Sequence, residues 1–176
     1  TQCTAMATCA LGTYIDSPGS TTTNRTCKAC ADGFFNATTT NAPNANSCIA
    51  WASCPAGTFI ATKGTTSTNK ICAACPTGQY QAASDKDSCT AFTTCIAGQY
   101  VTDPGSPIKA KTCGECDGVT NYSPTADAAS CTTMPTCTIG KILVDGSKTS
   151  GPTCSQCRTG TVSTNPISHD CVPSTP

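Results

Sequence analysis

Large aliphatic and aromatic side chains are scarce in this chain of 176 residues. Leu, Ile, Val and Phe together number 20, about 11% of the chain, and aromatic residues make up only 5%. A chain so poor in apolar groups cannot bury enough surface to offset roughly 1–2 kcal/mol of backbone entropy per ordered residue. We therefore expect no conventional hydrophobic core, and something covalent has to replace it.

Net charge and long apolar runs are lacking too. Ten basic and ten acidic side chains cancel, so electrostatics give no reason to expect binding to nucleic acid or to an anionic membrane surface. No apolar run approaches the roughly 20 residues that span a bilayer, so we expect no direct membrane insertion within this segment. Thr1 opens on the repeat described below without a signal-peptide core, which predicts a mature protein or a section of one.

Candidate catalytic groups are few. His169 is the only histidine, and the adjacent Ser168 and Asp170 do not make a catalytic triad, because that geometry does not come from neighbours in sequence. The acidic residues are scattered through loops and form neither a paired-carboxylate nor a calcium pattern. We predict no enzyme activity and no cofactor, and we interpret His169 as a solvated loop residue near the last cysteine.

Cysteine is what the chain has in abundance, with 17 residues. Disulfides contribute about 2–4 kcal/mol each for loops of this size and commonly stabilise small extracellular domains that lack a core. This density predicts an oxidising compartment, and the Thr-, Ser-, Asn- and Ala-rich remainder of the sequence agrees with an extracellular or cell-surface location.

The cysteines recur with a regular spacing. Successive cycles start at Cys3, Cys48, Cys89, Cys131 and Cys171, at intervals of 45, 41, 42 and 40 residues. A period this regular indicates a tandem array. We predict repeat 1 at 3–47, repeat 2 at 48–88, repeat 3 at 89–130, repeat 4 at 131–170, and the start of a truncated fifth repeat at 171–176.

Other residues keep the same phase. A Gly-x-aromatic phrase follows the second cysteine of repeats 1 to 3 and recurs after the Cys-x-x-Cys pair of repeats 1 and 2. Repeat 4 has Ile142 and Val162 in place of the rings, and after the pair of repeat 3 Gly118 comes early and Tyr122 late. No segment shows the 3.6-residue period of an amphipathic helix, so we expect short hairpins and little or no helix. Between the first two cysteines of each repeat stands one large apolar residue, whose recurrence favours packing over a ligand-binding role; these residues are Met6, Trp51, Phe92 and Met134.

Each repeat contains one Cys-x-x-Cys pair, which admits three interpretations. Two such pairs could bind zinc, but no histidine lies near them and other cysteines are interleaved at equal frequency. A redox role would need a strand-to-helix context and a depressed thiol pKa, and neither is indicated. We predict no metal site and favour structural disulfides.

Two repeating disulfide schemes are open. In the first, the long arm between the second and third cysteines closes on itself, and the short arm between the fourth and the next closes likewise. In the second, the first cysteine joins the second or third, which strands Cys171. The first scheme makes the two arms equivalent and is favoured. It pairs Cys9 with Cys27, Cys30 with Cys48, Cys54 with Cys72, Cys75 with Cys89, Cys95 with Cys113, Cys116 with Cys131, Cys137 with Cys154 and Cys157 with Cys171.

Under that scheme Cys3 is unpaired in this chain. We expect its partner to lie upstream of Thr1, and an intermolecular bond is the alternative. Three sequons predict N-linked glycans at Asn24, Asn36 and Asn121, with O-linked glycans as a further option.

Two resemblances follow from these motifs. The stretch Cys30-Ala-Asp-Gly-Phe-Phe, then Cys48-Ile-Ala-Trp51-Ala-Ser-Cys54 and Gly64-Thr-Thr-Ser-Thr-Asn before Cys72, resembles the cysteine-rich modules of tumour-necrosis-factor-receptor and growth-factor-receptor ectodomains. That resemblance implies the loop-by-loop pairing and a small disulfide-rich, β-poor, elongated repeat rod. The Thr-, Ala- and Ser-rich filling with Cys-Pro-Ala-Gly-Thr phrases is similar to ciliate immobilisation antigens, which implies a GPI-anchored surface antigen.

Three functions fit a disulfide-built repeat array. The leading hypothesis is a glycosylated structural surface-coat protein, which could self-associate into the coat. A subunit of an extracellular glycosylated filament is the second, with contacts between repeat ends continuing the array. A receptor-like ectodomain is the third, and it predicts one unusually apolar or charged face for a protein ligand.

Overall fold

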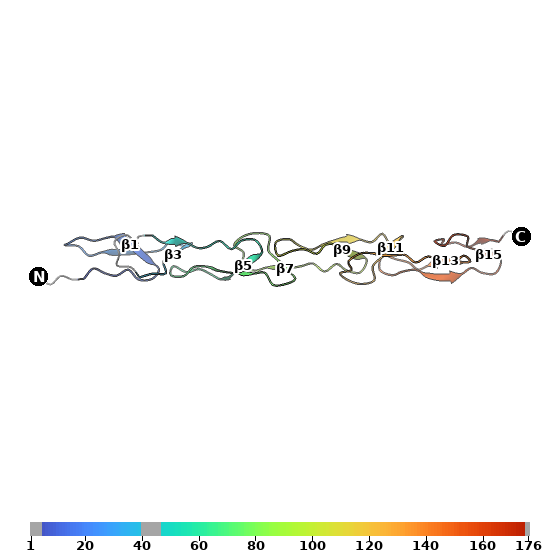
Figure 1. Cartoon of the computed structure of the whole chain (residues 1–176), viewed down its shortest axis with the longest axis horizontal. Helices are drawn as coiled ribbons and strands as arrows, with labels where there is room; N and C mark the ends of the chain where they lie inside the picture. The colour runs from blue at the N-terminus through green and yellow to red at the C-terminus, as the bar shows by residue number, and fades with distance from the viewer. Residues whose placement is uncertain (1–4, 40–46, 175–176) are drawn as a thin grey trace. The chain divides into compact units, whose positions relative to one another are not determined.

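The computed structural model describes residues 5–39 and 47–174, so Cys3 lies outside the described residues. In those ranges the chain forms short strands and no helix, as predicted. It follows that the described part has no helix that could cross a membrane. Figure 1 shows the strands as a succession of small pairs along the chain.

Each repeat contains one longer antiparallel hairpin and the first strand of a shorter one, whose second strand follows the first cysteine of the next repeat. The longer hairpins form the long arms, and they are β1 (Thr13–Ser17) with β2 (Thr26–Ala29), β5 (Thr58–Thr62) with β6 (Ile71–Ala74), β9 (Gln99–Asp103) with β10 (Thr112–Glu115), and β13 (Lys141–Val144) with β14 (Thr153–Gln156). The shorter ones belong to the short arms, and they are β3 (Phe34–Phe35) with β4 (Ile49–Ala50), β7 (Gln79–Tyr80) with β8 (Thr90–Ala91), β11 (Asn121–Tyr122) with β12 (Thr132–Thr133), and β15 (Thr161–Val162) with β16 (Val172–Pro173).

One disulfide closes each arm. The bonds join Cys9 to Cys27, Cys30 to Cys48, Cys54 to Cys72, Cys75 to Cys89, Cys95 to Cys113, Cys116 to Cys131, Cys137 to Cys154 and Cys157 to Cys171. This is the loop-by-loop scheme, and it occupies both cysteines of every Cys-x-x-Cys pair. The small disulfide-rich repeat fold expected from the sequence is confirmed.

Sulfur forms most of the buried interior. Among the described residues the buried apolar side chains are two aliphatic ones, Ile15 and Leu143, and six half-cystines, Cys9, Cys30, Cys54, Cys95, Cys116 and Cys137. The disulfides thus take the place of the missing hydrophobic core, and most other side chains point to solvent.

The Cys-x-x-Gly phrase has a backbone explanation. After Cys9 the amide of Thr13 donates to the carbonyl of Ala10 at 3.1 Å, which closes a four-residue turn with Gly12 at its third position and a φ of 77°. Glycine adopts that conformation at no steric cost, whereas most other residues are strained there. The turn brings the chain directly from the disulfide into β1.

The described chain divides into two compact units. One comprises Thr1–Ala91 with Pro107–Lys109, and the other Phe92–Ser106 with Ala110–Pro176. The division into four repeats and the start of a fifth stays a prediction from the spacing. Each hydrogen bond, ion pair and packing contact described in the next subsection joins residues of the same unit.

Candidate functional site

Successive repeats are joined by main-chain hydrogen bonds. The amide of Gly12 donates to the carbonyl of Asn36 at 2.8 Å, and the amide of Asn36 donates to the carbonyl of Thr66 at 2.8 Å. Thr66 lies at the tip of the long arm of repeat 2. A Cβ placed on Gly12 would lie 2.8 Å from Oγ1 of Thr66, so glycine also leaves room for that tip. We call this set of contacts the tip interface.

The tip interface recurs with different side chains. In the next two repeats the amide of Gly57 donates to Gln81 and that of Gln81 to Pro107, while the amide of Gly98 donates to Ser123 and that of Ser123 to Lys148. The N···O distances are 2.8–2.9 Å. Because the bonds use backbone atoms, the residues that make them can differ between repeats without loss of the contact.

A carboxylate ties the short arm of repeat 2 back to its first disulfide. Oδ1 of Asp85 accepts the amide of Cys54 at 2.9 Å, and the amide of Asp85 donates to the carbonyl of Cys54 at 2.8 Å. Nζ of Lys70 lies 2.7 Å from the same carboxylate, with only 13% of that lysine side chain exposed. The hydrogen bond from Lys70, then those from Cys54 and Ser53, lower the pKa of Asp85 to about 2.

The same arrangement occurs in repeat 3. Asp127 accepts the amide of Cys95 at 2.9 Å and pairs with Lys111 at 3.0 Å, and these contacts lower its pKa, that from Cys95 most. We call the two arrangements the Asp clamps. In repeat 4 the carbonyl of Pro166 accepts the amide of Cys137 instead, at 2.8 Å.

The interpretation of the acidic residues as scattered loop residues missed the Asp clamps. A signal was present, because Lys70 and Lys111 each stand two residues before the third cysteine of their repeat. The position of the aspartates varies by one residue relative to the preceding cysteine, which hides their common role.

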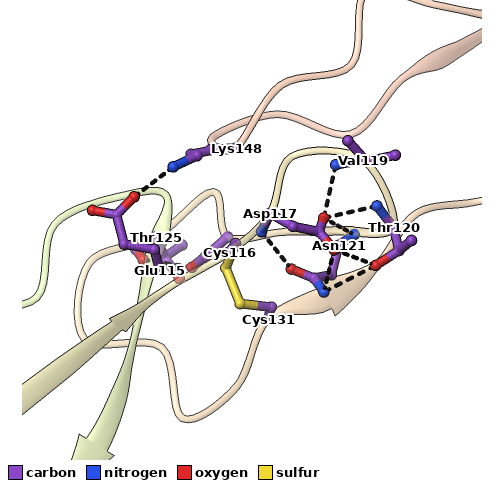
Figure 2. Close-up of a disulfide and its surroundings, with 10 residues drawn as sticks. Glu115, Cys116, Asp117, Val119, Thr120, Asn121, Thr125, Cys131 and Lys148 are labelled. Carbon is purple, nitrogen blue, oxygen red and sulfur yellow. Dashed lines mark hydrogen bonds and ion pairs between the residues drawn. A yellow bond between two sulfur atoms is a disulfide. The ribbon is translucent and has the colours of Figure 1, made fainter.

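The irregular short arm of repeat 3 is organised by Asp117, as Figure 2 shows. Its Oδ1 accepts the amides of Val119 and Thr120, both at 2.7 Å, and that of Asn121 at 3.0 Å. The hydroxyl of Thr120, followed by these amides, holds the pKa of Asp117 far below its usual range. The cysteines of this short arm are 15 residues apart, against 14 in repeat 2. Tyr122 nevertheless occupies the second position of its strand, as Tyr80 does in repeat 2.

Repeat 1 carries an apolar groove of about 350 Å³. Its lining comes from β1, β2, the turn before β3, the first residue of β3 and the second disulfide, and consists of Tyr14, Lys28, Ala29, Ala31, Phe34 and Cys48. The ring of Phe34 is 41% exposed at this site. The corresponding first residues of β7 and β15 are Gln79 and Thr161, so the exposed ring distinguishes repeat 1 from repeats 2 and 4.

The large apolar residues between the first two cysteines differ in burial. The ring of Trp51 packs over Gly64, and its Nε1 donates to the carbonyl of Thr65 at 3.1 Å, which confirms packing for this residue. Phe92 and Met134 are half-buried, whereas Met6 is 43% exposed.

The three sequon asparagines lie in different environments. Asn24 is exposed, and its Oδ1 accepts the amides of Ala7 and Arg25 at 2.9 and 2.8 Å. Asn36 is only 7% exposed, and its Nδ2 donates to the carbonyl of Thr13 at 2.9 Å. Asn121 is half-buried, and its Nδ2 donates to Asp117 at 3.3 Å.

His169 lies away from any reactive constellation. Its Nδ1 is 3.0 Å from the carbonyl of Leu143, so the exposed ring is anchored to β13 rather than only solvated, which refines the sequence interpretation. Ser168 Oγ donates to the carbonyl of Asp170. The described residues contain no cluster of three or more His, Cys, Asp or Glu side chains suited to a metal ion.

Together these features define a class: a tandem array of disulfide-clasped cysteine-rich modules linked by main-chain hydrogen bonds. Residues 75–113, from the short arm of repeat 2 into the long arm of repeat 3, match the model of the TNFR/NGFR cysteine-rich region. The match covers less than a quarter of the chain, and it supports the module fold that the resemblance predicted.

The solved structures that match this chain include chains from two related complexes. A chain of the mouse RANKL–OPG complex is 19% identical with a TM-score of 0.36, over 73% of this chain and 93% of that one. A chain of the human RANKL/OPG complex is 21% identical with a TM-score of 0.37, over 87% and 91%. Among curated proteins none matches. None of these matches is a ciliate surface antigen, so that resemblance stays a hypothesis.

Proposed function

We propose that this chain is a structural component of an extracellular surface coat, a surface antigen that acts by steric display and without catalysis. One observation carries the proposal: the contacts that hold the repeats are disulfides and backbone hydrogen bonds, as in the tip interface from Gly12 through Asn36 to Thr66. The contacts between successive repeats therefore depend little on which side chains the loops carry. A coat protein needs such a scaffold because its exposed loops can then differ in sequence without loss of the fold.

Glycans and a lipid anchor belong to the same proposal. Asn24 is the best N-linked acceptor, because its Oδ1 makes the structural hydrogen bonds and Nδ2 is the atom to which a glycan attaches. The Thr- and Ser-rich tips add sites for O-linked glycans. Attachment to the membrane would use a GPI anchor, as the resemblance to immobilisation antigens implies, and not an apolar span in this segment.

Antibody labelling of the source cells tests the coat. We expect dense, uniform labelling of intact, non-permeabilised cells by an antibody against this chain, and release of the antigen by phosphatidylinositol-specific phospholipase C. Labelling only after permeabilisation would contradict a surface location altogether. Surface labelling that resists the lipase would keep the coat and remove the GPI anchor.

A receptor-like ectodomain is the second candidate, and the groove of repeat 1 favours it. Phe34, Tyr14 and Lys28 form an exposed apolar site with a single cation beside it, the kind of face on which protein ligands dock. If this function holds, we expect the fluorescently labelled chain to bind saturably to cells that carry its protein ligand. The substitution Phe34→Glu should abolish that binding. Ile96→Glu is the matched control, because Ile96 is 63% exposed and lies outside the groove. Non-saturable binding, or equal loss with both variants, would remove this candidate.

A further inference from the structure

Three Asp-Gly dipeptides occur in the sequence, and the coat proposal uses none of them. They are Asp32–Gly33, Asp117–Gly118 and Asp145–Gly146. An aspartate before glycine can isomerise spontaneously, because no side chain on the glycine keeps its amide nitrogen away from the aspartate Cγ. All three aspartates are exposed, so exposure alone does not distinguish them. Their hydrogen bonds do distinguish them.

Both reacting groups of Asp117–Gly118 are engaged (Figure 2). Oδ1 of Asp117 accepts three main-chain amides, and Oδ2 accepts the hydroxyl of Thr120 at 2.5 Å. The amide of Gly118 donates to the carbonyl of Asn121 at 3.0 Å. The Thr120 hydroxyl and these amides hold the pKa of Asp117 far below its usual range, so its carboxyl is rarely in the neutral form that loses water. This dipeptide should resist isomerisation.

Neither restraint is present at Asp145–Gly146. Among the described residues nothing donates to the Asp145 carboxylate, and the amide of Gly146 has no acceptor. Asp145 follows the end of β13, and Gly146 precedes the tip turn that begins at Ser147, so no strand ladder holds them. Both residues are exposed, whereas Gly33 and Gly118 are half-buried.

The corresponding position is exposed in an inner repeat as well. Lys63 precedes Gly64 as Asp145 precedes Gly146, and the Lys63 side chain is 77% exposed although repeat 3 follows it. Accessibility at this point is therefore a property of the long arm itself.

Asp32–Gly33 is intermediate between the other two. Its carboxylate and its glycine amide have no hydrogen-bond partner in the described part of the chain. However, the amide of Phe34 donates to the carbonyl of Ala31 at 3.1 Å, which closes a turn around the dipeptide, and the carbonyl of Gly33 accepts the amide of Trp51 at 2.8 Å. Ring closure has to rotate the central peptide against that turn, so we expect slower isomerisation than at Asp145.

Asp145 lies close in sequence to the tip interface of repeats 3 and 4. The amide of Ser123, which is 0% exposed, donates to the carbonyl of Lys148 at 2.9 Å. Isoaspartate adds one carbon to the main chain just before this tip and so displaces the Lys148 carbonyl from its donor. A buried amide without an acceptor is costly, so isomerisation should weaken docking of the tip.

We propose that Asp145–Gly146 is a modification site at which Asp145 converts spontaneously to isoaspartate and loosens the tip interface of repeats 3 and 4. The amide nitrogen of Gly146 bonds to Cγ of the neutral Asp145 carboxyl, and the amide proton and the carboxyl hydroxyl leave as water. A second water opens the resulting ring imide. Opening at Cγ restores aspartate, whereas opening at the main-chain carbonyl carbon leaves the chain running through Cβ and Cγ.

The reaction needs only water, so modified chains accumulate with the age of the protein. The coat proposal does not depend on this site and would survive its failure.

Ageing of the intact, disulfide-bonded chain at neutral pH tests the site. Peptide mapping with electron-transfer fragmentation measures isoaspartate at each dipeptide, with unaged chain as the zero point. We expect several-fold more isoaspartate at residue 145 than at residue 117, with residue 32 between them. In chain that is reduced and denatured before ageing the three values should converge, because the hydrogen bonds of Asp117 are lost. Equal isoaspartate at residues 117 and 145 of the folded chain would overturn the proposal.

Two variants test the chemistry at Asp145. Asp145→Glu would have to close a six-membered ring, which forms far more slowly, and Gly146→Ala keeps Asp145 but places a methyl group beside the attacking nitrogen. Both should slow modification at residue 145 several-fold, whereas Asp32→Glu, the matched control, should leave it unchanged. An undiminished rate in both variants would contradict ring closure through the Gly146 amide.

Hydrogen exchange reports the effect on the interface. In aged chain the Ser123 amide should exchange several-fold faster than in fresh chain, and Asp145→Glu should show no such increase. The amide of Gln81 is the control, because it donates to Pro107 in the tip interface of repeats 2 and 3, away from any Asp-Gly dipeptide. Unchanged exchange at Ser123 in chains that carry isoaspartate at residue 145 would overturn the loosening of the interface.

Discussion

Nζ of Lys70 lies 2.7 Å from Oδ1 of Asp85, and that oxygen also accepts the amide of Cys54. The carboxylate thereby joins the end of the short arm to the first disulfide of the same repeat, across 31 residues of sequence. Asp127 makes the equivalent link between Lys111 and Cys95. The Asp clamps limit how far the two arms of a repeat can move apart.

Removing the charge of Asp85 should loosen repeat 2. Asp85→Asn retains an oxygen for the Cys54 amide and tolerates the φ of 58°, but it leaves the 13%-exposed Lys70 without its counter-charge. We expect several-fold faster hydrogen exchange at the Cys54 amide and a thermal transition lower by a few degrees. Hydrogen–deuterium exchange and calorimetry measure both effects.

Asp87→Asn is the control for that variant. Asp87 pairs with Lys63 at 3.3 Å, but their side chains are 64% and 77% exposed, and such surface pairs contribute little. Its exchange pattern should match that of the unmodified chain. Equal effects of Asp85→Asn and Asp87→Asn would show that the Asp85 clamp has no special role.

Acid should release the Asp clamps while the disulfides stay intact. Because the folded pKa of Asp85 is about 2 and its ordinary value is 3.8, its stabilising contribution is fully present above pH 3.8 and is lost as the pH falls through about 2. The pKa of Asp127 is lowered as well, so its contribution is lost in the same direction.

Amide chemical shifts in an NMR titration check this prediction. The chemical shifts of the Cys54 and Cys95 amides should change as the pH falls from about 4 to about 1, since each amide donates to a carboxylate whose pKa is lowered. The Cys137 amide donates to the carbonyl of Pro166, which does not titrate, and should stay unchanged. A parallel shift at all three amides would mean general acid unfolding rather than release of the Asp clamps.

Much of the fold could be predicted because cysteine spacing is a strong signal. The second and third cysteines of a repeat, such as Cys9 and Cys27, are 18 residues apart in three repeats and 17 in the fourth. A repeating pairing therefore leaves few schemes open. The glycine after Cys9 likewise predicts a turn, because few other residues accept its φ.

The contacts between repeats could not be predicted in the same way. The tip interface uses the backbone of residues as different as Thr66, Pro107 and Lys148, so no side-chain pattern marks it. The Asp clamps depend on Asp85 and Asp127 folding back across 31 and 32 residues, and their spacing from the preceding cysteine differs. The groove of repeat 1 arises where residues from separate strands meet.

Crowding at Gly64 predicts a cost for any side chain there. The φ of Gly64 is not in the left-handed region, yet a Cβ would lie 2.5 Å from Cε2 of the Trp51 ring. We expect Gly64→Ala to lower the free energy of unfolding by about 1–3 kcal/mol, as overpacking usually does, and to shift tryptophan fluorescence to longer wavelength. Gly146→Ala is the matched control, because its nearest neighbour, Cβ of Pro152, would be 3.2 Å away. Equal destabilisation by both changes would argue against packing of Trp51 as the cause.

Glycan occupancy should separate Asn24 from Asn36. A glycan replaces one hydrogen on Nδ2. In Asn36, which is only 7% exposed, that nitrogen donates to the carbonyl of Thr13, whereas Asn24 is exposed and accepts two backbone amides through Oδ1. We therefore expect Thr26→Ala, which removes the Asn24 sequon, to lower the mass of the chain secreted from eukaryotic cells by one N-glycan. Thr38→Ala, which removes the Asn36 sequon, should change the mass only by the substitution. Intact-protein mass spectrometry measures both variants, and a glycan lost from Thr38→Ala instead would mean that Asn36 is modified before its repeat folds around it.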